Sequence, residues 1–520
     1  MARPLYITTT LPYVNADPHI GFALEIVQAD IITRYRKTQG DEVFFNTGTD
    51  EHGQKIFEAA KKAGTTPQAY VDEYAAKFRT LKEALSLDAD LHFIRTTDTH
   101  HVEAAQEIWR RCAAAGDIEK RTYKGLYCVG DEAFIKDSEL VNGRCPNHPN
   151  MDPVELEEEN YFFLLSKYQK QLLEYLSKEG SVMPEWRRQE AIRFVEQGLE
   201  DFSISRVKEK MPWGIPVPGD ESQVMYVWFD ALTNYISTLG WPADTEGNFK
   251  KFWEDGEVMQ VAGKDQVRFQ SIMWQAMLMS AQIKNTDHVF YHGFITSGGQ
   301  KMSKSLGNVI NPITITEEYG SDALRYFLAR HVHPFEDSDV TMERFKEIYN
   351  ADLANGLGNI VSRVMRLAEM YLDKPAISSK EIEQAGHFVY SEKFKKKFEE
   401  FDIKGCMDAM WSYVPRIKGT LQAEDGDDSV FIKTIHNVMT PEMSLGVSSV
   451  AGINQTMQTE QPFKVIKENK EKALQLIRMS VLEIASLGKA LEPFMPETSE
   501  RILQAVATNQ KPENLFPRKE

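Results

Sequence analysis

Cysteine is scarce in this sequence, with only four in 520 residues, which is too few for a disulfide framework in a chain of this length. No uninterrupted apolar run is long enough to span a bilayer. The most apolar stretch, residues 269–283, is interrupted by Gln270, Gln275 and Gln282. Residues 5–10, which read as a strand, come almost directly after Met1, so we expect no signal peptide. We therefore expect a cytoplasmic protein without a membrane segment.

Positive charge is also in deficit, because 60 Lys and Arg residues face 77 Asp and Glu residues and give a net charge of −17. This balance argues against broad non-specific nucleic-acid binding, which needs a basic face. A local basic groove for RNA remains compatible with it. Hydrophobic residues make up 42% and charged residues 26%, a composition typical of globular domains.

Two common phosphate-binding loops are missing: there is no Gly-x-x-x-x-Gly-Lys-Ser/Thr and no complete Gly-x-Gly-x-x-Gly. A nucleotide enzyme with this sequence must hold phosphates in another way. His19 stands at the start of a helix predicted over residues 19–37, where free backbone N–H groups and the helix dipole attract anions. Gly21 would let a flat base or ribose lie against the backbone. Taken alone, His19 is also explained by a local capping role.

Strand-like and helical segments alternate over the first hundred residues. Strands are predicted at 5–10 and 43–45, and helices at 19–37 and 67–85. The first helix has Phe22, Ile26, Ile31 and Tyr35 on one apolar face. This alternation predicts an α/β domain with a parallel sheet and active loops at the strand ends.

The later sequence divides the chain further. Residues 120–217 have an acidic run and two of the four cysteines, and from residue 345 the pattern is mainly helical, as in a bundle. We expect the polar tail from Pro512 to be loose. The predicted parts are a Rossmann-like catalytic domain in two halves (1–119 and 218–344), a connective insertion between them (120–217) and a helical domain (345–520).

A second basic element is Lys301-Met302-Ser303-Lys304-Ser305, which follows the strand-like residues 291–296 and the flexible Ser297-Gly298-Gly299. Two lysines three residues apart, with serine donors, can clamp a pyrophosphate as charge develops on the leaving group. A basic loop by itself is usually solvated surface. Taken together, however, this loop and the element His19-Ile20-Gly21 resemble the two signatures of class I aminoacyl-tRNA synthetases.

Within this class the sequence is similar to the methionyl-tRNA synthetases. The similarity covers roughly residues 3 to 411 and returns from Gly452 to about residue 505. It implies formation of methionyl-adenylate and pyrophosphate from methionine and ATP with Mg²⁺, then transfer of the methionyl group to tRNA(Met), by a monomer. The segments that carry it are Leu11-Pro12-Tyr13-Val14-Asn15, Thr47-Gly48-Thr49-Asp50-Glu51-His52-Gly53-Gln54-Lys55, Tyr226-Val227-Trp228-Phe229-Asp230-Ala231 and Gly263-Lys264-Asp265.

The resemblance also implies site residues. Asp50 would pair with the ammonium group of methionine, and aromatic edges suit its thioether. Core packing explains each aromatic equally well when it is taken singly. The methionine pocket would comprise Leu11, Tyr13, Asp50, Trp228, Ala231, Tyr235 and Phe269. The ATP site would comprise Tyr13, Asn15, His19, Gly21, His292, Gly293, Phe294 and Lys304, with His19, Lys301 and Lys304 as the catalytic residues.

Two positions depart from the family pattern. Phe22 stands where the family usually has a second histidine, and loss of one transition-state contact of this kind typically costs ~2.7–4 kcal/mol. Either another group compensates or activity is low. Gln270 replaces the histidine commonly found beside Phe269, which places the polar rim of the pocket in question.

The insertion carries a metal hypothesis. Some family members have a zinc knuckle with Cys-x-x-Cys and Cys-x-x-His at this spacing. Here the ligands would be Cys128, Asp131, Cys145 and His148, with a carboxylate in place of one thiolate. The alternative is a decayed knuckle that is held by packing without a metal.

The helical region resembles the anticodon-binding bundle of the family. Asn359 and Arg363, at i and i+4, would share a helix face and read base edges. Phe463 follows Pro462 where the family has a base-stacking tryptophan, and its alternative role is packing within the bundle. About forty extra residues, 412–451, interrupt the expected helix, and we assign them no function.

Three alternatives compete with the main hypothesis. Synthetases for leucine, isoleucine and valine usually carry a large editing insertion, for which residues 120–217 leave too little space. A cysteine enzyme would hold zinc in its amino-acid pocket, and no cysteine lies near Leu11, Asp50 or Trp228 in the sequence. A catalytically impaired tRNA-binding paralogue is the remaining alternative, motivated by Phe22 and Gln270.

Overall fold

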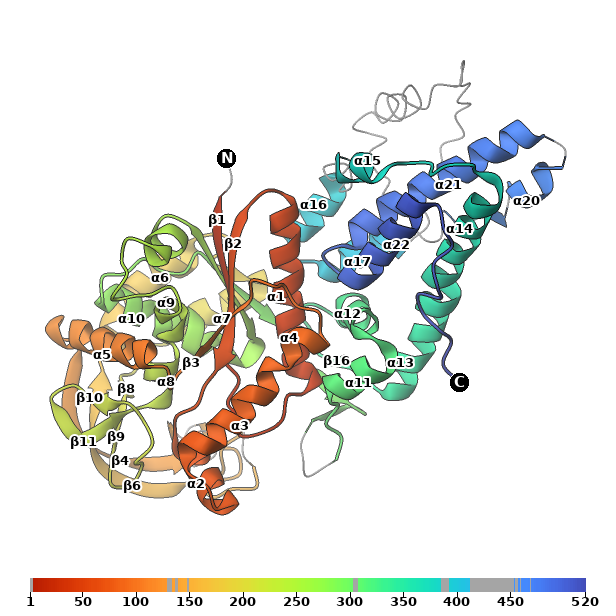
Figure 1. Ribbon diagram of the computed structural model, residues 1–520. Coiled ribbons are helices and arrows are strands. Elements are labelled where there is room, and N and C mark those ends of the chain that lie inside the picture. Colours follow the sequence, from red (N-terminus) through yellow and green to blue (C-terminus); the bar gives the residue numbers. More distant parts are fainter. Residues whose placement is uncertain are drawn as a thin grey trace. The chain divides into compact units, whose positions relative to one another are not determined.

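The computed structural model describes residues 3–128, 133–135, 139–146, 149–302, 307–384, 392–411, 453, 457–458, 460–467 and 469–520. The chain divides into two compact units (Figure 1). The sheet unit comprises residues 1–18, 42–80 and 89–292, and the helical unit comprises residues 19–41, 81–88 and 293–520. The predicted division into four parts follows a different criterion, sequence pattern, and stays a prediction.

The sheet unit is organised around a six-stranded parallel sheet with the order β3-β2-β1-β12-β13-β7. The order reverses at β1, which has β2 on one side and β12 on the other. Ligands of open parallel sheets bind beyond the carboxyl ends of the strands at such a reversal. The strands are β1 (Pro4–Thr9), β2 (Glu42–Thr49), β3 (His92–Arg95), β7 (Val182–Met183), β12 (Glu257–Gly263) and β13 (His288–His292).

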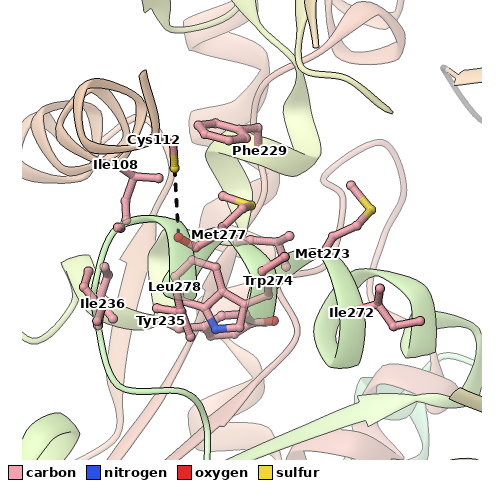
Figure 2. Packing of buried hydrophobic residues seen from close by; sticks show 14 of the residues in the cluster. Ile108, Cys112, Phe229, Tyr235, Ile236, Ile272, Met273, Trp274, Met277 and Leu278 are labelled. Carbon is pink, nitrogen blue, oxygen red and sulfur yellow. Dashed lines mark hydrogen bonds between the residues drawn. The ribbon is translucent and has the colours of Figure 1, made fainter. Parts of the chain in front are cut away.

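The core of the sheet unit lies where helices α5 and α10 pack together (Figure 2). Helix α5 buries Ala104, Ile108 and Cys112, which recur at helical spacing. The thiol of Cys112 donates to the carbonyl oxygen of Met277 at 3.9 Å. The helices of this unit are α2 (Gln54–Ala63), α3 (Pro67–Arg79), α5 (Thr99–Ala114), α6 (Gln169–Ser177), α7 (Glu185–Glu196), α8 (Val227–Ala231), α9 (Asn234–Ser237) and α10 (Trp274–Ser280).

Two smaller antiparallel sheets complete this unit. One has the order β5-β4-β6-β8 and the other β10-β11-β9. In the long pair β4–β6, Phe162 and Phe163 point to opposite faces and are both buried, whereas Lys124 pairs with Glu155 at 3.0 Å in solvent. These strands are β4 (Ile118–Cys128), β5 (Ala133–Ile135), β6 (Val154–Phe163), β8 (Phe202–Ser203), β9 (Ser205–Val207), β10 (Pro216–Val217) and β11 (Asp220–Met225).

The helical unit contains the long helices α1, α14, α21 and α22 and a small sheet of order β15-β14-β16. Helices α21 and α22 approach closely because Gly488 has no side chain, and a Cβ there would lie 2.9 Å from Cγ2 of Ile502. The strands are β14 (Ile295–Ser297), β15 (Gln300–Lys301) and β16 (Ser338–Asp339). The helices are α1 (Ile20–Thr38), α4 (Leu81–Ala84), α11 (Pro312–Tyr319), α12 (Ser321–Arg330), α13 (Met342–Ile348), the π-helix η7 (Tyr349–Gly358), α14 (Asn359–Tyr371), α15 (Ser379–Gln384), α16 (Glu392–Glu399), α17 (Ile403–Trp411), α20 (Pro462–Val465), α21 (Lys470–Leu491) and α22 (Pro496–Thr508).

The predicted fold class, a parallel-sheet α/β domain followed by a helical bundle, is confirmed. The predicted tail is wrong. Leu515 and Phe516 are buried, the hydroxyl of Tyr349 donates to the carbonyl of Pro517 at 2.9 Å, and Asn350 accepts from the backbone of Lys519 at 2.9 Å. Two buried apolar side chains and these bonds hold the segment in place. Among the helices that the structure describes, none combines the length and the apolar character needed to cross a membrane.

Candidate active site

Asp50 begins the site because it directly follows β2, at the reversal of the strand order. Its backbone N–H donates to the carbonyl of Pro12 at 3.0 Å, and its own carbonyl accepts from Val14 at 3.2 Å. These bonds hold Asp50 against the loop after β1, which carries Leu11 and Tyr13. The side chain of Asp50 is buried, so a carboxylate is held at the carboxyl ends of two neighbouring strands.

The turn after Asp50 is fixed by the buried side chain of Glu51. Arg95, at the end of β3, makes two bonds to its carboxylate at 2.7 and 2.9 Å. Thr49 donates to the same carboxylate at 2.6 Å, and the indole N–H of Trp213 donates to the carbonyl of Glu51 at 2.6 Å. A paired buried carboxylate of this kind costs stability when one partner is removed, but it defines the path of the turn.

A second buried network joins the Asp50 turn to helix α8. His52 Nδ1 lies 3.0 Å from one carboxylate oxygen of Asp230, and His101 Nε2 lies 3.2 Å from the other. Burial alone would raise the pKa of Asp230, but the two imidazoles outweigh it and lower that pKa. Asp230 therefore stays ionised and ties α8, which carries Trp228 and Ala231, to the turn that carries Asp50.

Aromatic side chains form one wall of the candidate pocket. Trp228 and Phe269 stack with ring centroids 3.9 Å apart and planes inclined by 14°. Both rings are half-buried, whereas Ala231 and Tyr235 are buried. A stacked pair with a partly exposed face is a suitable surface for a thioether. Core packing alone does not explain the exposure of these two rings.

Gln270 has a defined partner at the position where the sequence departs from the family. Its amide nitrogen donates to the hydroxyl of Tyr235 at 2.7 Å, and its backbone carbonyl accepts from Gln275 at 2.8 Å. Gln270 is 1% exposed, and within the described parts of the chain its Oε1 has no hydrogen-bond partner. The glutamine thus orients Tyr235 and leaves one buried acceptor.

His19 caps helix α1 in the helical unit. Its Nδ1 accepts from the backbone N–H of Gly21 at 3.1 Å, so the neutral ring carries its proton on Nε2. The surrounding protein atoms lower the pKa of His19 by desolvation, although the residue keeps an exposed face. The local capping role is therefore real, and it directs an N–H donor away from the backbone at the positive end of a helix.

The strands β14 and β15 form a hairpin that carries Lys301. Its turn residues Gly298 and Gly299 have φ values of 63° and 73°, a conformation that favours glycine. Asp339 accepts from the backbone of Gly299 at 2.7 Å and from the hydroxyl of Thr296 at 3.0 Å. The ammonium group of Lys301 lies 6.0 Å from the ring centre of Phe294. Lys304 lies outside the described residues.

The predicted adenine-binding segment spans the end of β13. His292 is buried at the last position of this strand in the sheet unit. Gly293 passes so close to Glu336 that a Cβ would lie 2.2 Å from the backbone of that residue, which excludes any side chain. The backbone of Phe294 donates to Asp337 at 2.9 Å. Asn15 is exposed, and its N–H donates to the carbonyl of Tyr13 at 2.9 Å.

The candidate anticodon residues are accessible. Asn359 is exposed at the start of α14, and Arg363 is half-buried one turn later. Phe463, in α20, is 41% exposed, so part of its surface is accessible for stacking. The insertion at 412–451 lies outside the described residues, and its role stays unassigned.

The candidate metal ligands are described only in part. Cys128 and Cys145 are both buried, whereas Asp131 and His148 lie outside the described residues. Across the ranges that the structure describes, no three His, Cys, Asp or Glu side chains are grouped to hold a metal ion. Two buried thiols suit zinc chemically, but no complete set of four ligands is on view.

The sequence indicated candidate site residues but not the side chains that hold them in place. The structure brings Tyr13 together with Asp50, and Trp228 together with Phe269, while His19 and Lys301 lie in the helical unit. Arg95 and His101 were not predicted, because each acts through a partner distant in sequence. The only available signal was the pair of acidic residues, Glu51 and Asp230, inside the matched segments.

Comparisons with known proteins agree with this geometry. The family described as tRNA synthetases class I (M) matches residues 5–152 and 148–365, and the anticodon binding domain of methionyl tRNA ligase matches residues 444–517. A methionine–tRNA ligase of Nostoc sp. is 38% identical over 506 residues, covering 96% of this chain and 89% of that protein. One from Thermosynechococcus vestitus is 46% identical over 377 residues, covering 72% and 70% of the two chains.

A solved structure is also similar. The methionyl-tRNA synthetase of Mycobacterium tuberculosis, in complex with methionyl-adenylate, has a TM-score of 0.81 and 33% identity and covers 100% of this chain and 99% of its own. The chain therefore belongs to the methionyl-tRNA synthetases, class I aminoacyl-tRNA ligases whose substrates are methionine, ATP and tRNA.

Proposed function

We propose that the sheet unit binds methionine and that residues of the helical unit act on the phosphates of ATP. One observation carries the first half: Asp50, which is buried at two strand ends, is tied through His52 and Asp230 to the helix that bears Trp228. A fixed carboxylate suits the ammonium group of the amino acid. The stacked Trp228 and Phe269 suit its side chain.

The chemistry of the first step needs little covalent assistance. A carboxylate oxygen of methionine attacks the α-phosphorus of ATP, the bond to the bridging oxygen breaks, and pyrophosphate leaves with its electron pair. His19 offers an N–H donor at Nε2 and stays neutral, while Lys301 and Lys304 supply positive charge for the developing pyrophosphate. In the second step a terminal ribose hydroxyl of tRNA attacks the carbonyl carbon and AMP leaves.

Magnesium is proposed to accompany ATP as its counter-ion. Cys128, Asp131, Cys145 and His148 are the proposed zinc ligands in a structural role, away from the reaction, and no step depends on them. Elemental analysis of protein purified without added metal tests this set, and a Cys145→Ser variant that keeps the wild-type zinc content would contradict it.

We further propose a cytoplasmic monomer in which Asn359, Arg363 and Phe463 contact the anticodon.

Amino-acid-dependent ATP–pyrophosphate exchange tests the proposal, with methionine compared against leucine, isoleucine and cysteine. Exchange with methionine alone, lost in Asp50→Asn, is the expected result. A folded protein without exchange for any of the four would favour the catalytically impaired tRNA-binding paralogue. Exchange that survives in Asp50→Asn with an unchanged KM for methionine would contradict the pocket assignment.

A further inference from the structure

Arg325, in the middle of helix α12, is a fully buried charged side chain of the helical unit, with 0% exposure. Its Nε donates to the carbonyl of Phe494 at 2.9 Å, and its two Nη groups donate to Pro493 at 2.8 Å and Leu85 at 3.1 Å. Nη2 also lies 2.6 Å from a carboxylate oxygen of Asp30. The planar guanidinium thus binds three carbonyls and one carboxylate at once.

Asp30 receives this contact on helix α1. It is 0% exposed, and the oxygen that meets Arg325 also accepts from Arg34 at 2.8 Å. Its other oxygen accepts from the backbone of Asp88 at 2.7 Å. Both carboxylate oxygens are therefore bonded, which makes Asp30 a fixed point in the middle of α1.

Helix α1 connects the fixed Asp30 to its N-cap, His19. His19 is the N-cap of α1, and a continuous helix from Ile20 to Thr38 leaves little freedom between the cap and Asp30. At the other end of the helix, Tyr35 stacks on Phe398 of α16 with ring centroids 3.7 Å apart. The position of the His19 ring is therefore set by contacts further along α1.

Arg325 also contacts the connection between α21 and α22. Pro493 and Phe494 lie in this turn, within the residues that match the anticodon binding domain. Asp322, one helical turn earlier on α12, accepts from the backbone of Thr498 at 2.5 Å and ties α12 to the start of α22. One guanidinium therefore contacts both the helix that His19 caps and the turn of the C-terminal helices.

We propose that Arg325 is a positioning residue for adenylate formation: through Asp30 it holds the helix that His19 caps in a fixed place relative to the α21–α22 turn. The proposal rests on the role of His19 given above. A lysine keeps the positive charge but has one point of attachment, so it cannot hold three carbonyls and a carboxylate together. Arg325→Lys should shift α1 without removing the buried charge.

The decisive comparison sets Arg325→Lys against Arg330→Lys. Arg330 lies on the same helix and bonds to Asp352 at 2.9 Å and Asp408 at 3.1 Å, and within the described residues it forms no hydrogen bond or ion pair with α1. We expect Arg325→Lys to lower kcat for ATP–pyrophosphate exchange at least tenfold with the KM for methionine unchanged, and Arg330→Lys to change kcat less than threefold. Equal loss in both variants, or a rise in the KM for methionine alone, would overturn the proposal.

Two further readouts separate positioning from general destabilisation. Hydrogen–deuterium exchange of the first turn of α1 should accelerate in Arg325→Lys and stay at the wild-type rate in Arg330→Lys. In a double-mutant cycle, Asp30→Asn with Arg325→Lys should be no slower than the slower single variant, because both act through one contact. Additive losses in kcat, or an unchanged rate of hydrogen–deuterium exchange in α1, would contradict the proposal that Arg325 acts on His19 through Asp30.

The failure of the proposal differs from the failure of the assigned reaction. If His19→Ala leaves ATP–pyrophosphate exchange unchanged, the role of His19 is wrong and Arg325 has nothing to position. If His19→Ala is slow while Arg325→Lys is as fast as wild type, the role of His19 stands and the positioning role of Arg325 fails.

Discussion

The backbone N–H of Ile20 donates to the carbonyl of Ile310 at 2.9 Å. This bond joins the start of helix α1 to the segment that follows Lys301 and Lys304 in the sequence. The same region brings the methyl group of Met302 close to Gly21. Within the helical unit, His19 and Lys301 are thus linked through their neighbours. A change at the start of α1 should therefore affect phosphate chemistry more than it affects folding.

Gly21→Ala tests this link. An added Cβ would lie 3.0 Å from Nδ1 and Cε1 of His19, so the ring must move or its bond to the backbone must break. Alanine itself favours a helix over glycine by roughly 0.5–1 kcal/mol, so stability should be maintained. We expect kcat for ATP–pyrophosphate exchange to fall at least tenfold with an unchanged melting temperature. Gly356→Ala is the control, because the nearest atom there is 3.4 Å away. Equal kcat in wild type and Gly21→Ala would contradict the link.

The two units should respond differently to loss of their main polar groups. His19→Ala removes a donor for the transition state, and loss of one such donor typically lowers kcat by about 10²–10³. Asp50→Ala removes the partner of the ammonium group and should abolish methionine binding. Pre-steady-state adenylate formation and equilibrium binding of methionine measure the two effects separately. Equal losses in rate and binding for His19→Ala would show that its role is not specific to the transition state.

Gln270→Met tests the substitution that distinguishes this pocket. The variant keeps the volume of the side chain and removes the donor to the hydroxyl of Tyr235, which is buried. Loss of one buried hydrogen bond typically costs about 0.5–1.5 kcal/mol, and Tyr235 would lose the amide group that orients its hydroxyl. We expect the KM for methionine to rise roughly tenfold while kcat changes less. Gln275→Met is a control for loss of a buried glutamine in general, since Gln275 bonds to Thr286, Asn285 and the backbone carbonyl of Gln270 and leaves the bond from Gln270 to Tyr235 in place. A KM that is unchanged in Gln270→Met would place Tyr235 outside the pocket.

Local elements were predictable from the sequence because their signals are local. The apolar positions Phe22, Ile26 and Ile31 predicted a helix over 19–37, and α1 runs from Ile20 to Thr38. The predicted helix over 67–85 is instead divided into α3 and α4. The position of the candidate residue Asp50 after a strand was also predictable, since the carboxyl ends of parallel strands lie at one edge of a sheet.

Long-range partners were not predictable. Nothing around Asp30 announces that its carboxylate meets Arg325, which lies 295 positions later in the chain (325 − 30). The same holds for His101 and Asp230, whose pairing depends on the packing of α5 against α8. The tail appeared loose because polar residues dominate it, yet burial of Leu515 and Phe516 and the bonds to Asn350 decide its position. Composition reports the average of a segment, and two apolar anchors are enough to override it.

The pH dependence of stability should depend on Asp322. This carboxyl is 4% exposed, and burial raises its pKa from near 4 to about 6, against the opposing effects of Thr498 and Arg325. A carboxyl whose pKa is raised by folding stabilises the folded state most at low pH. That contribution is lost as pH rises from about 4 through about 6. Asp322→Asn keeps an oxygen that can accept from Thr498 and removes the ionisation. We therefore expect the variant and wild type to have similar free energies of unfolding near pH 4.5. At pH 7.5 the variant should be more stable than wild type by about 1–3 kcal/mol. Denaturant unfolding at the two pH values measures the difference, with the exposed Asp339→Asn as the control. A difference that is the same at both pH values would show that Asp322 does not titrate in this range.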